Sequence, residues 1–344
     1  NLVGGQDELV FDGGSMVIDP RGKTLAFGKS FEEDLVVTDV PVRPKKKTSK
    51  AVVLSKAVFH KAQAPLVAQV APEGTDFERI YKALVLGTRD YMCKNKFRDC
   101  LIGLSGGIDS SLVAAIAVDA IGKGNVIGVS MPSRFTSAGT RSDARALAGN
   151  LGIKFHEIPI ERMFEAYLEQ LKEIFGEQPF GRAEENLQAR IRGTILMTLS
   201  NRWGSLVLTT GNKSEIGVGY CTLYGDMSGG FAVIKDVPKT TVYQLARLVN
   251  QQAGKDTIAQ SVLDRAPTAE LRENQKDQDS LPPYDILDAM LREYVEEHRS
   301  LAEMARKNAK ELVKKVIAMV DSNEYKRRQG PPGIKITPRA FGKD

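Results

Sequence analysis

The stretch Leu101-Ile102-Gly103-Leu104-Ser105-Gly106-Gly107-Ile108-Asp109-Ser110-Ser111 decides the fold of this chain. An apolar run enters a glycine-rich turn and continues into an apolar segment, which is the pattern of a buried strand followed by a helix. In an open parallel sheet, ligands bind where such a strand ends. Gly106 and Gly107 let the backbone come close to a ligand, while the first N–H groups of the helix and three serine hydroxyls supply donors. The turn therefore predicts an anion site, most simply a pyrophosphate site.

Asp109 needs a separate explanation, because a carboxylate inside an anion site repels the ligand. A divalent cation between them removes the conflict, so Asp109 implies Mg²⁺ shared with phosphate oxygens. The stretch is neither a Walker loop, since no Gly-Lys-Ser/Thr follows, nor a dinucleotide fingerprint, since the GxGxxG spacing is absent. The alternative is an ordinary glycine-rich turn in which Asp109 only begins a helix.

Beyond residue 98, short apolar runs alternate with amphipathic stretches. The runs cover 100–104, 125–131, 155–160 and 206–209, and the amphipathic stretches cover 110–121, 140–151, 161–175 and 184–202. This alternation indicates βαβ units and an α/β fold, an open and mostly parallel sheet with helices on both faces. Further helices are expected over 77–92, after a capping box that begins at Thr75, and over 240–252, 284–297 and 301–320.

The first 74 residues have a different character. Residues 8–40 predict three or four short strands, one of them at Leu35–Val37, and residues 41–74 are rich in Pro, Lys, Ala and Gln, as in a linker. We therefore expect a short β-rich segment at 1–40, a linker at 41–74 and an α/β domain at 75–344. A segment of about 40 residues cannot bury both faces of its strands. It either pairs with another part of the molecule or is poorly ordered.

Composition limits the classes of function. The chain has 344 residues, 42% hydrophobic and 26% charged, and no apolar run approaches the ~18 residues of a membrane span. The formal net charge of +5 suits anionic ligands but is too small to require nucleic acid. The three cysteines lack the spacing of a zinc site. We expect a soluble cytoplasmic protein with reduced thiols and with neither a membrane nor a nucleic-acid partner.

Residues 105–111, SGGIDSS, resemble the pyrophosphatase loop of the adenine-nucleotide α-hydrolase-like ATP pyrophosphatases, which adenylate an oxygen and release pyrophosphate. Five further stretches resemble the NAD synthetases: 185–192 (ENLQARIR), 209–215 (TTGNKSE), 224–226 (YGD), 266–271 (APTAEL) and 323–329 (NEYKRRQ). The opening residues 4–13 resemble the last strands of the nitrilase-type glutaminase domain in the glutamine-dependent form of that family. This resemblance covers nearly the whole chain.

The resemblance also implies a set of site residues. ATP contacts would be Gly103, Leu104, Ser105, Gly106, Gly107, Ile108, Asp109, Ser110, Thr210, Lys239 and Thr268, with Asp109 and Lys239 as the catalytic residues. Contacts to the dinucleotide substrate would be Asn186, Arg190, Glu215, Tyr220, Cys221, Thr222, Leu223, Asp226 and Lys326. Mg²⁺ would lie on Asp109 and Glu215. The second of these follows the strand 206–209, so the two carboxylates meet if that strand and the strand 100–104 are neighbours.

The implied reaction is the amidation of deamido-NAD, with ATP as co-substrate and ammonia or glutamine as nitrogen donor, in a homodimer or larger homo-oligomer. The Glu, Lys and nucleophilic Cys of the glutaminase lie upstream in the family. Cys93, Cys100 and Cys221 all lie in the synthetase part, so none of them is a candidate nucleophile. We expect that the native chain continues upstream, and that the chain as given does not hydrolyse glutamine.

Several assignments have simpler alternatives. Arg190 could be a solvated helix charge, Lys326 to Arg328 a basic surface tail, and Lys239 only a cation at a helix start. Tyr220 to Leu223 could pack rather than bind. The apolar residues of 184–202 could form a dimer seam or face the core. For the whole chain, the alternatives are a tRNA-modifying adenylating enzyme of the same fold and an inactive fragment that serves only in assembly.

Overall fold

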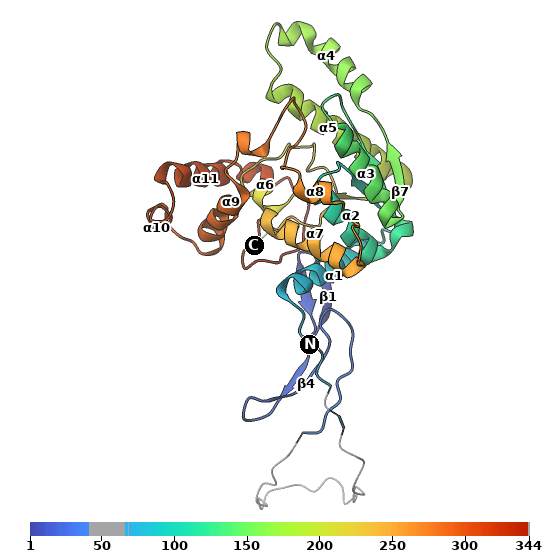
Figure 1. The fold of residues 1–344 in the computed structure, drawn as a ribbon, viewed down its shortest axis with the longest axis vertical. Coiled ribbons are helices and arrows are strands. Elements are labelled where there is room, and N and C mark those ends of the chain that lie inside the picture. The colour runs from blue at the N-terminus through green and yellow to red at the C-terminus, as the bar shows by residue number, and fades with distance from the viewer. Residues whose placement is uncertain (41–65, 68, 343–344) are drawn as a thin grey trace, which may run out of the picture. The chain divides into compact units, whose positions relative to one another are not determined.

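A computed structural model describes residues 1–40, 66–67 and 69–342 of the chain (Figure 1). Most of the predicted linker, residues 41–65 and 68, lies outside the described residues. The described residues belong to two compact units. One comprises parts of 1–4 and 11–74, and the other comprises 5–10 and the chain from residue 75 onward.

Short strands form at the N-terminal end of the chain. They are β1 (Val3–Gln6), β2 (Leu9–Asp12), β3 (Met16–Ile18) and β4 (Thr24–Phe27). β1 pairs with β2, and β3 pairs with β4 in antiparallel register. The strand predicted at Leu35–Val37 is wrong, because that stretch finds no partner strand among the described residues and Leu35 is 81% exposed. Leu2, Met16 and Ile18 are exposed as well, as expected for a segment too small to bury its apolar side chains.

The second unit is built on a five-stranded parallel sheet, which confirms the predicted fold class. Its strands are β5 (Cys100–Gly103), β6 (Val126–Ser130), β7 (Lys154–Glu157), β8 (Leu206–Thr209) and β9 (Phe231–Ala232), and their order is β7-β6-β5-β8-β9. β6 and β8 are buried along their whole length, because helices cover both faces. In the edge strand β7, exposed and half-buried residues alternate instead. The sequence did not indicate β9, whose two residues are too few for a pattern.

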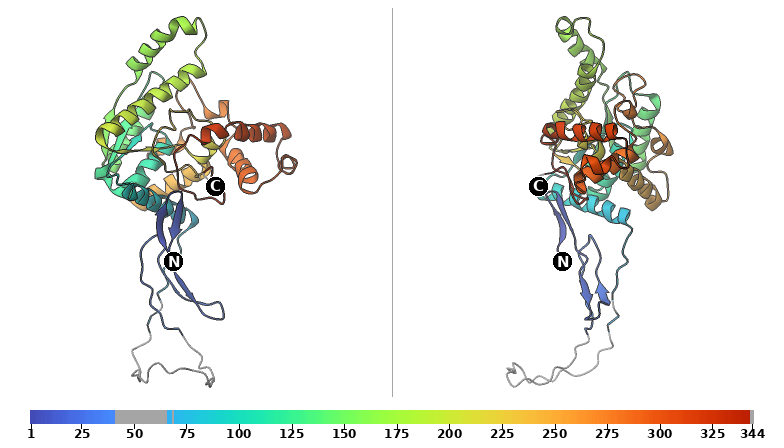
Figure 2. Two further views of the ribbon diagram at one scale, coloured as in Figure 1. Left: turned by 180° about the vertical axis from the view of Figure 1, so that it is seen from behind. Right: turned by 90° about the vertical axis from the view of Figure 1, so that its left-hand side faces the viewer.

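Helices cover the two faces of the sheet (Figures 1 and 2). α1 (Asp76–Lys94), α2 (Ile108–Ile121), α3 (Ala138–Leu151) and α7 (Lys239–Ala253) contribute to one core, together with Ile102 of β5. α4 (Glu161–Phe175) and α5 (Arg182–Trp203) contribute to a second core with Leu101, the next residue of the same strand. The alternation of strand side chains thus separates the two cores. The apolar residues of α5 that could form a dimer seam pack into the second core, and the homodimer stays a prediction.

The C-terminal helices form a third core. They are α9 (Tyr284–Leu291) with a π-helical turn at Arg292–Glu296, α10 (Leu301–Met304) and α11 (Lys310–Ser322). The short helix α12 (Glu324–Arg327) follows and contributes no residue to this core. The single helix predicted over 301–320 is divided at residues 305–309. There Ala309 has an extended backbone (φ −57°, ψ 125°) and begins α11 as its N-cap residue. Two further short helices are α6 (Lys213–Gly217) and α8 (Gln260–Asp264). None of the described helices combines the length and the apolar character needed to cross a bilayer.

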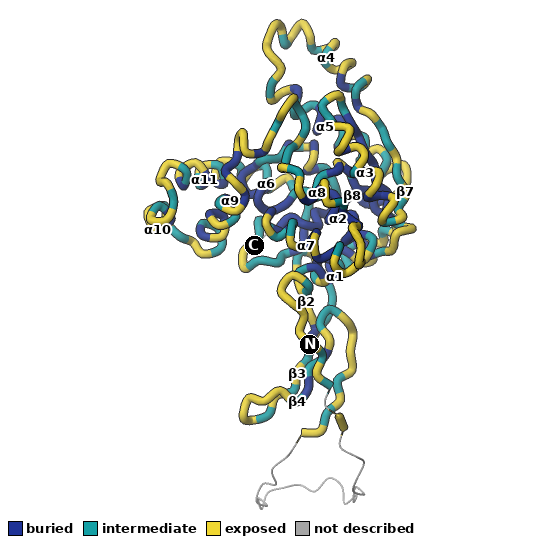
Figure 3. The backbone as a smooth tube through the Cα atoms, in the orientation of Figure 1, coloured by how far each residue is buried: buried dark blue, intermediate teal, exposed yellow. Residues whose placement is uncertain are grey.

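The helix α4 depends on a single buried side chain. Most of α4 is exposed (Figure 3). Phe164 is 1% exposed, whereas Tyr167, one turn later, is 52% exposed and Ile174 is 80% exposed. We expect Phe164→Ala to lower the free energy of unfolding by about 3–5 kcal/mol, because it leaves a cavity against the sheet. Tyr167→Ala is the matched control and should change it by less than about 1 kcal/mol. Urea unfolding followed by circular dichroism measures both. Equal effects of the two substitutions would contradict this account of how α4 is held.

Candidate functional site

The site lies where the order of the sheet reverses. After β5 the chain adds β6 and β7 on one side and then returns to place β8 on the other side of β5. The turns that follow β5 and β8 therefore leave the carboxyl ends of neighbouring strands, which is where open α/β sheets bind ligands. β5 and β8 are therefore neighbours. The prediction that Asp109 and Glu215 meet depended on this pairing.

The glycine-rich turn after β5 is held tightly in place. Gly106 has φ +79°, and a Cβ there would lie 2.1 Å from the carbonyl oxygen of Thr140 in α3, so only glycine fits. The N–H of Gly107 donates to Ser105 Oγ (3.1 Å), which lies 3.1 Å from Ser110 Oγ. The side chains of Leu104 and Ile108 are buried in the core. Of these two predicted ATP contacts, only the backbone can face a ligand.

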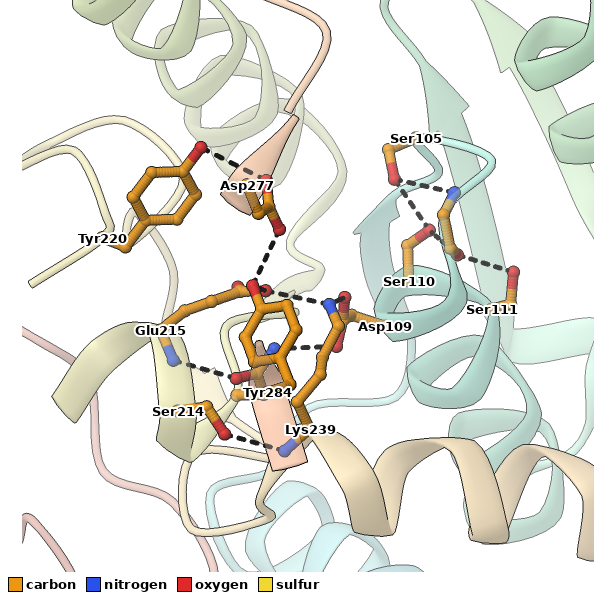
Figure 4. Close-up of polar contacts among 12 residues, drawn as sticks. Ser105, Asp109, Ser110, Ser111, Ser214, Glu215, Tyr220, Lys239, Asp277 and Tyr284 are labelled. Carbon is orange, nitrogen blue, oxygen red and sulfur yellow. Dashed lines mark hydrogen bonds and ion pairs between the residues drawn. The ribbon is translucent and has the colours of Figure 1, made fainter. Parts of the chain in front are cut away.

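Lys239 joins the two predicted metal carboxylates (Figure 4). Its Nζ lies 2.5 Å from Asp109 Oδ2 and 2.9 Å from Glu215 Oε1, and the lysine side chain is 3% exposed. Lys239 is the first residue of α7, where the positive end of a helix disfavours a cation. Burial also opposes its charge, yet the two carboxylates together raise the pKa of the ammonium above its ordinary value. Lys239 is therefore more than a cation at a helix start.

Two neighbouring groups hold this cluster in position. Asn212 Nδ2 donates to Asp109 Oδ1 (2.9 Å), and Asn212 Oδ1 accepts from the N–H of Glu215 (3.0 Å), so one amide side chain aligns both carboxylates. Ser214 Oγ accepts from the N–H of Lys239 (2.8 Å) and donates to Asp288 of α9. The short helix α6 and the start of α7 are thus fixed to each other.

A third carboxylate, Asp277, lies beside this cluster. Tyr284 OH donates to Asp277 Oδ2 (2.7 Å) and lies within hydrogen-bond distance of Glu215 Oε1 (3.2 Å), and Tyr220 OH donates to Asp277 Oδ1 (3.2 Å) (Figure 4). Burial, opposed by Lys239 and reinforced by Asp109 and Asp277, raises the pKa of the Glu215 carboxyl to about 7. Burial likewise raises the pKa of Asp277. The site contains more negative charge than Lys239 can balance.

This excess of negative charge suits a hard cation. No three His, Cys, Asp or Glu side chains among the described residues form a metal site on their own. Mg²⁺, however, is commonly held by one or two carboxylates, with phosphate oxygens and water as the other ligands. Each carboxylate of Asp109 and Glu215 can accept about four hydrogen bonds or metal contacts. Each accepts only two side-chain hydrogen bonds from described residues, so both have room for a cation.

The predicted substrate contacts form a second group next to Glu215. Thr222 donates through Oγ1 to Asn186 Oδ1 (2.8 Å) and through its N–H to Asp226 Oδ1 (2.6 Å). Lys326 Nζ donates to the carbonyls of Gly219 (2.7 Å) and Cys221 (2.9 Å), so it is not part of a free basic tail. On the exposed face of α5, Arg190 donates to the carbonyl of Leu223 (3.2 Å), which ties it to the same segment.

A small pocket connects the two groups. Glu215, Tyr220, Cys221 and Asp226 line it together with Lys235 and residues around Gly330, and its volume of about 10 Å³ accommodates roughly one water molecule. The structure thus brings Glu215 and the predicted substrate residues Tyr220, Cys221 and Asp226 to one pocket. Thr210 and Thr268 make no hydrogen bond to Asp109, Glu215 or Lys239 among the described residues. The roles of all the predicted site residues stay predictions.

Sequence reasoning missed Asn212, Asp277 and Tyr284. Asn212 had a local signal, because Asn-Lys-Ser-Glu at 212–215 has the spacing of a helix N-cap followed by an acidic third residue. Asp277 and Tyr284 had no local signal. Tyr284 lies 69 residues beyond Glu215, and only the folding of the third core against α6 brings the two together.

The chain was compared with known proteins. A family model described as NAD synthase matches residues 80–330. A glutamine-dependent NAD(+) synthetase of Thermotoga maritima is 50% identical over the whole chain, which spans 62% of the length of that protein. A solved glutamine-dependent NAD+ synthetase of Acinetobacter baumannii, in complex with ADP, is 44% identical with a TM-score of 0.65 and covers 99% of this chain and 59% of its own.

A shorter relative has also been solved. The NH3-dependent NAD synthetase of Campylobacter jejuni is 25% identical with a TM-score of 0.59, and the match covers 74% of this chain and 96% of that one. The family model spans more than half of the chain and includes the turn after β5, Glu215 and Lys239. The chain belongs to the NAD synthase family.

Proposed function

We propose that this chain makes NAD by adenylating the nicotinate carboxylate of deamido-NAD with ATP and then amidating it with ammonia. One observation carries this proposal. The buried Lys239 lies between Asp109 of the glycine-rich turn and Glu215 beyond the neighbouring strand. A buried cation between two carboxylates, beside a cradle of backbone donors, suits a reaction in which negative charge builds up on a departing pyrophosphate.

In the first step, a carboxylate oxygen attacks the α-phosphorus of ATP, and the bond from that phosphorus to the bridging oxygen of pyrophosphate breaks. The nicotinate carboxylate has to be activated in this way because its bare oxygen is a poor leaving group. The N–H groups at the start of α2 and the hydroxyls of Ser105 and Ser110 bind the pyrophosphate part. Lys239 balances the charge that develops on it. Mg²⁺ on Asp109 and Glu215 supplies further positive charge to the phosphate oxygens when bound.

In the second step, ammonia attacks the carbonyl carbon of the adenylate, the bond from carbon to the AMP oxygen breaks, and a proton leaves the nitrogen. The pocket bounded by Glu215, Tyr220 and Asp226 accommodates a donor the size of ammonia. Water has the same size, so the site must discriminate by access rather than by volume. Lys326 supports this proposal because it braces residues 219–221, which form one side of the pocket.

Ammonia is the nucleophile that we propose for this site, whether it is supplied as ammonium or is released from glutamine by an upstream glutaminase part. The shorter Campylobacter jejuni relative, described as NH3-dependent, is covered almost completely by the match to this chain. The three cysteines do not form a nucleophile site of the kind that glutamine hydrolysis needs. Burial raises the pKa of the Cys100 thiol in β5 well above its ordinary value and that of Cys221 to about 12, so neither is a ready thiolate.

The direct test is to incubate the purified chain with ATP, Mg²⁺, deamido-NAD and ammonium and to measure NAD, AMP and pyrophosphate. We expect the three products in equal amounts, and no pyrophosphate when deamido-NAD is left out. Glutamine in place of ammonium should give little NAD. Absence of product with every nitrogen donor would support the inactive-fragment alternative. Pyrophosphate release that requires tRNA would support the tRNA-modifying alternative.

Lys239 and Asp109 should be indispensable. We expect Lys239→Met and Asp109→Asn each to lower the rate of NAD formation at least about 100-fold, since each removes a charge at the phosphate that departs. Lys172→Met and Asp256→Asn, at exposed positions of α4 and of the loop after α7, are matched controls and should keep the rate within twofold. Wild-type rates in the Lys239→Met enzyme would refute the proposed first step.

Glu215 should act through the cation. Glu215→Gln keeps the shape and the acceptor oxygen but removes the negative charge, so we expect the Mg²⁺ concentration for half-maximal rate to rise about tenfold. Titration of the rate with MgCl₂ at saturating ATP measures this. An unchanged Mg²⁺ requirement, with only a lower maximal rate, would remove Glu215 from the proposed metal site.

A further inference from the structure

Arg265 contacts the glycine-rich turn at the carbonyl of Gly106. It follows α8, and its Nη1 donates to the carbonyl oxygen of Gly106 (3.2 Å). Its Nη2 forms an ion pair with Asp143 of α3, and the second oxygen of Asp143 accepts from Ser261 Oγ (2.8 Å). None of the motifs or roles considered above includes Arg265, Asp143 or Ser261.

The contact decides which way one peptide group points. In a planar trans peptide, the C=O of Gly106 and the N–H of Gly107 point in opposite directions. The guanidinium holds the carbonyl oxygen on its own side of the turn, so the N–H of Gly107 points to the opposite side, where it donates to Ser105 Oγ. An N–H on the side of Ser105 attracts an anion, whereas a carbonyl in the same place would repel it. Glycine allows both orientations of such a peptide, so the orientation needs an external support.

The support is itself fixed on a rigid element. Asp143 lies in α3, and its side chain is only 12% exposed. A Cβ at Gly139, in the first turn of α3, would lie 3.5 Å from Arg265 Nη2, so the guanidinium lies against that turn. The same end of α3 contacts Gly106 through the carbonyl of Thr140. One helix end therefore positions both the turn and the arginine that orients it.

We propose that Arg265, fixed by Asp143, is a positioning residue that keeps the Gly106–Gly107 peptide in the orientation that binds the pyrophosphate part of ATP. This inference rests on the proposed function for the identity of the ligand. The guanidinium acts through Gly106 and does not contact the phosphate. Arg265 begins the segment 265–271, which also contacts α3 through the hydrogen bond from Thr140 Oγ1 to Glu270 Oε1 (2.9 Å). Weakening of the arginine contact should therefore leave the segment attached.

The test measures binding of inorganic pyrophosphate with Mg²⁺ by isothermal titration calorimetry. Loss of a charge-assisted hydrogen bond at this position should weaken pyrophosphate binding about tenfold in Arg265→Met. Arg265→Lys keeps one donor and should weaken it about threefold, which also keeps the test valid if the methionine variant folds poorly. Arg145→Met, an exposed arginine on the same helix α3, is the matched control and should bind as the unmodified protein does.

Kinetics separate a positioning role from a merely structural one. In NAD formation, Arg265→Lys should raise the KM for ATP by the same factor as the pyrophosphate Kd, with the KM for deamido-NAD unchanged within twofold. Asp143→Asn should weaken pyrophosphate binding in the same direction, because it frees the guanidinium from its anchor. Binding that is unchanged or tighter in Asp143→Asn, with weaker binding in Arg265→Met, would mean that Arg265 contacts the phosphate directly and would overturn the positioning role.

The remaining outcomes are also informative. Pyrophosphate affinity that is equal in Arg265→Met and the unmodified protein would overturn the inference, as would an unmodified protein that binds no pyrophosphate. Failure of the proposed function has a different signature. In that case the unmodified protein binds pyrophosphate, and the Arg265 variants weaken that binding, but no NAD is formed from deamido-NAD and ammonium.

Discussion

The ion pairs of Lys239 with Asp109 and Glu215 are the constraint on which the site depends. Three elements meet in these two contacts: α2 supplies Asp109, α6 supplies Glu215 and α7 supplies the lysine. A buried ion pair is costly unless its geometry is good and its remaining hydrogen-bonding capacity is used. Here Asn212 donates to Asp109, and the Tyr284 hydroxyl lies within hydrogen-bond distance of Glu215. These contacts use only part of the accepting capacity of the two carboxylates, and the remaining capacity and the surplus negative charge suit a cation.

The order of the sheet makes this meeting possible. Because β8 pairs directly with β5, the turns after both strands open on the same edge, although more than 100 residues separate them in sequence. α7 begins at the same edge, so its first residue extends into the site rather than along the helix surface. A chain with the same helices and strands but another strand order would place the three charges apart. Topology, more than any single residue type, therefore determines the chemistry.

Local patterns predicted the central part of the fold and failed where partners are distant. The buried strands and the turn at 103–110 follow from apolar runs, glycines and a helix start, all within a few residues. The break at 305–309 escaped prediction because the apolar pattern continues through it, although the backbone of Ala309 is extended. The resemblance supplied Lys239 and Glu215, since no spacing links them. Neither a local pattern nor the resemblance indicated Asp277 and Tyr284, because only tertiary packing brings them to Glu215.

The position of Glu215 is fixed by groups that no ligand needs to contact. Directly before it, Lys213 is 1% exposed and binds Asp236, Glu296 and Thr337, while Ser214 binds Asp288. α6 has only five residues and could not hold its own orientation by helical hydrogen bonds alone. The buried lysine behind it and the serine beside it therefore fix the helix from two sides. The two buried lysines thus have different tasks. Lys213 holds α6, and with it Glu215, in place, whereas Lys239 balances the charge of the Glu215 carboxylate.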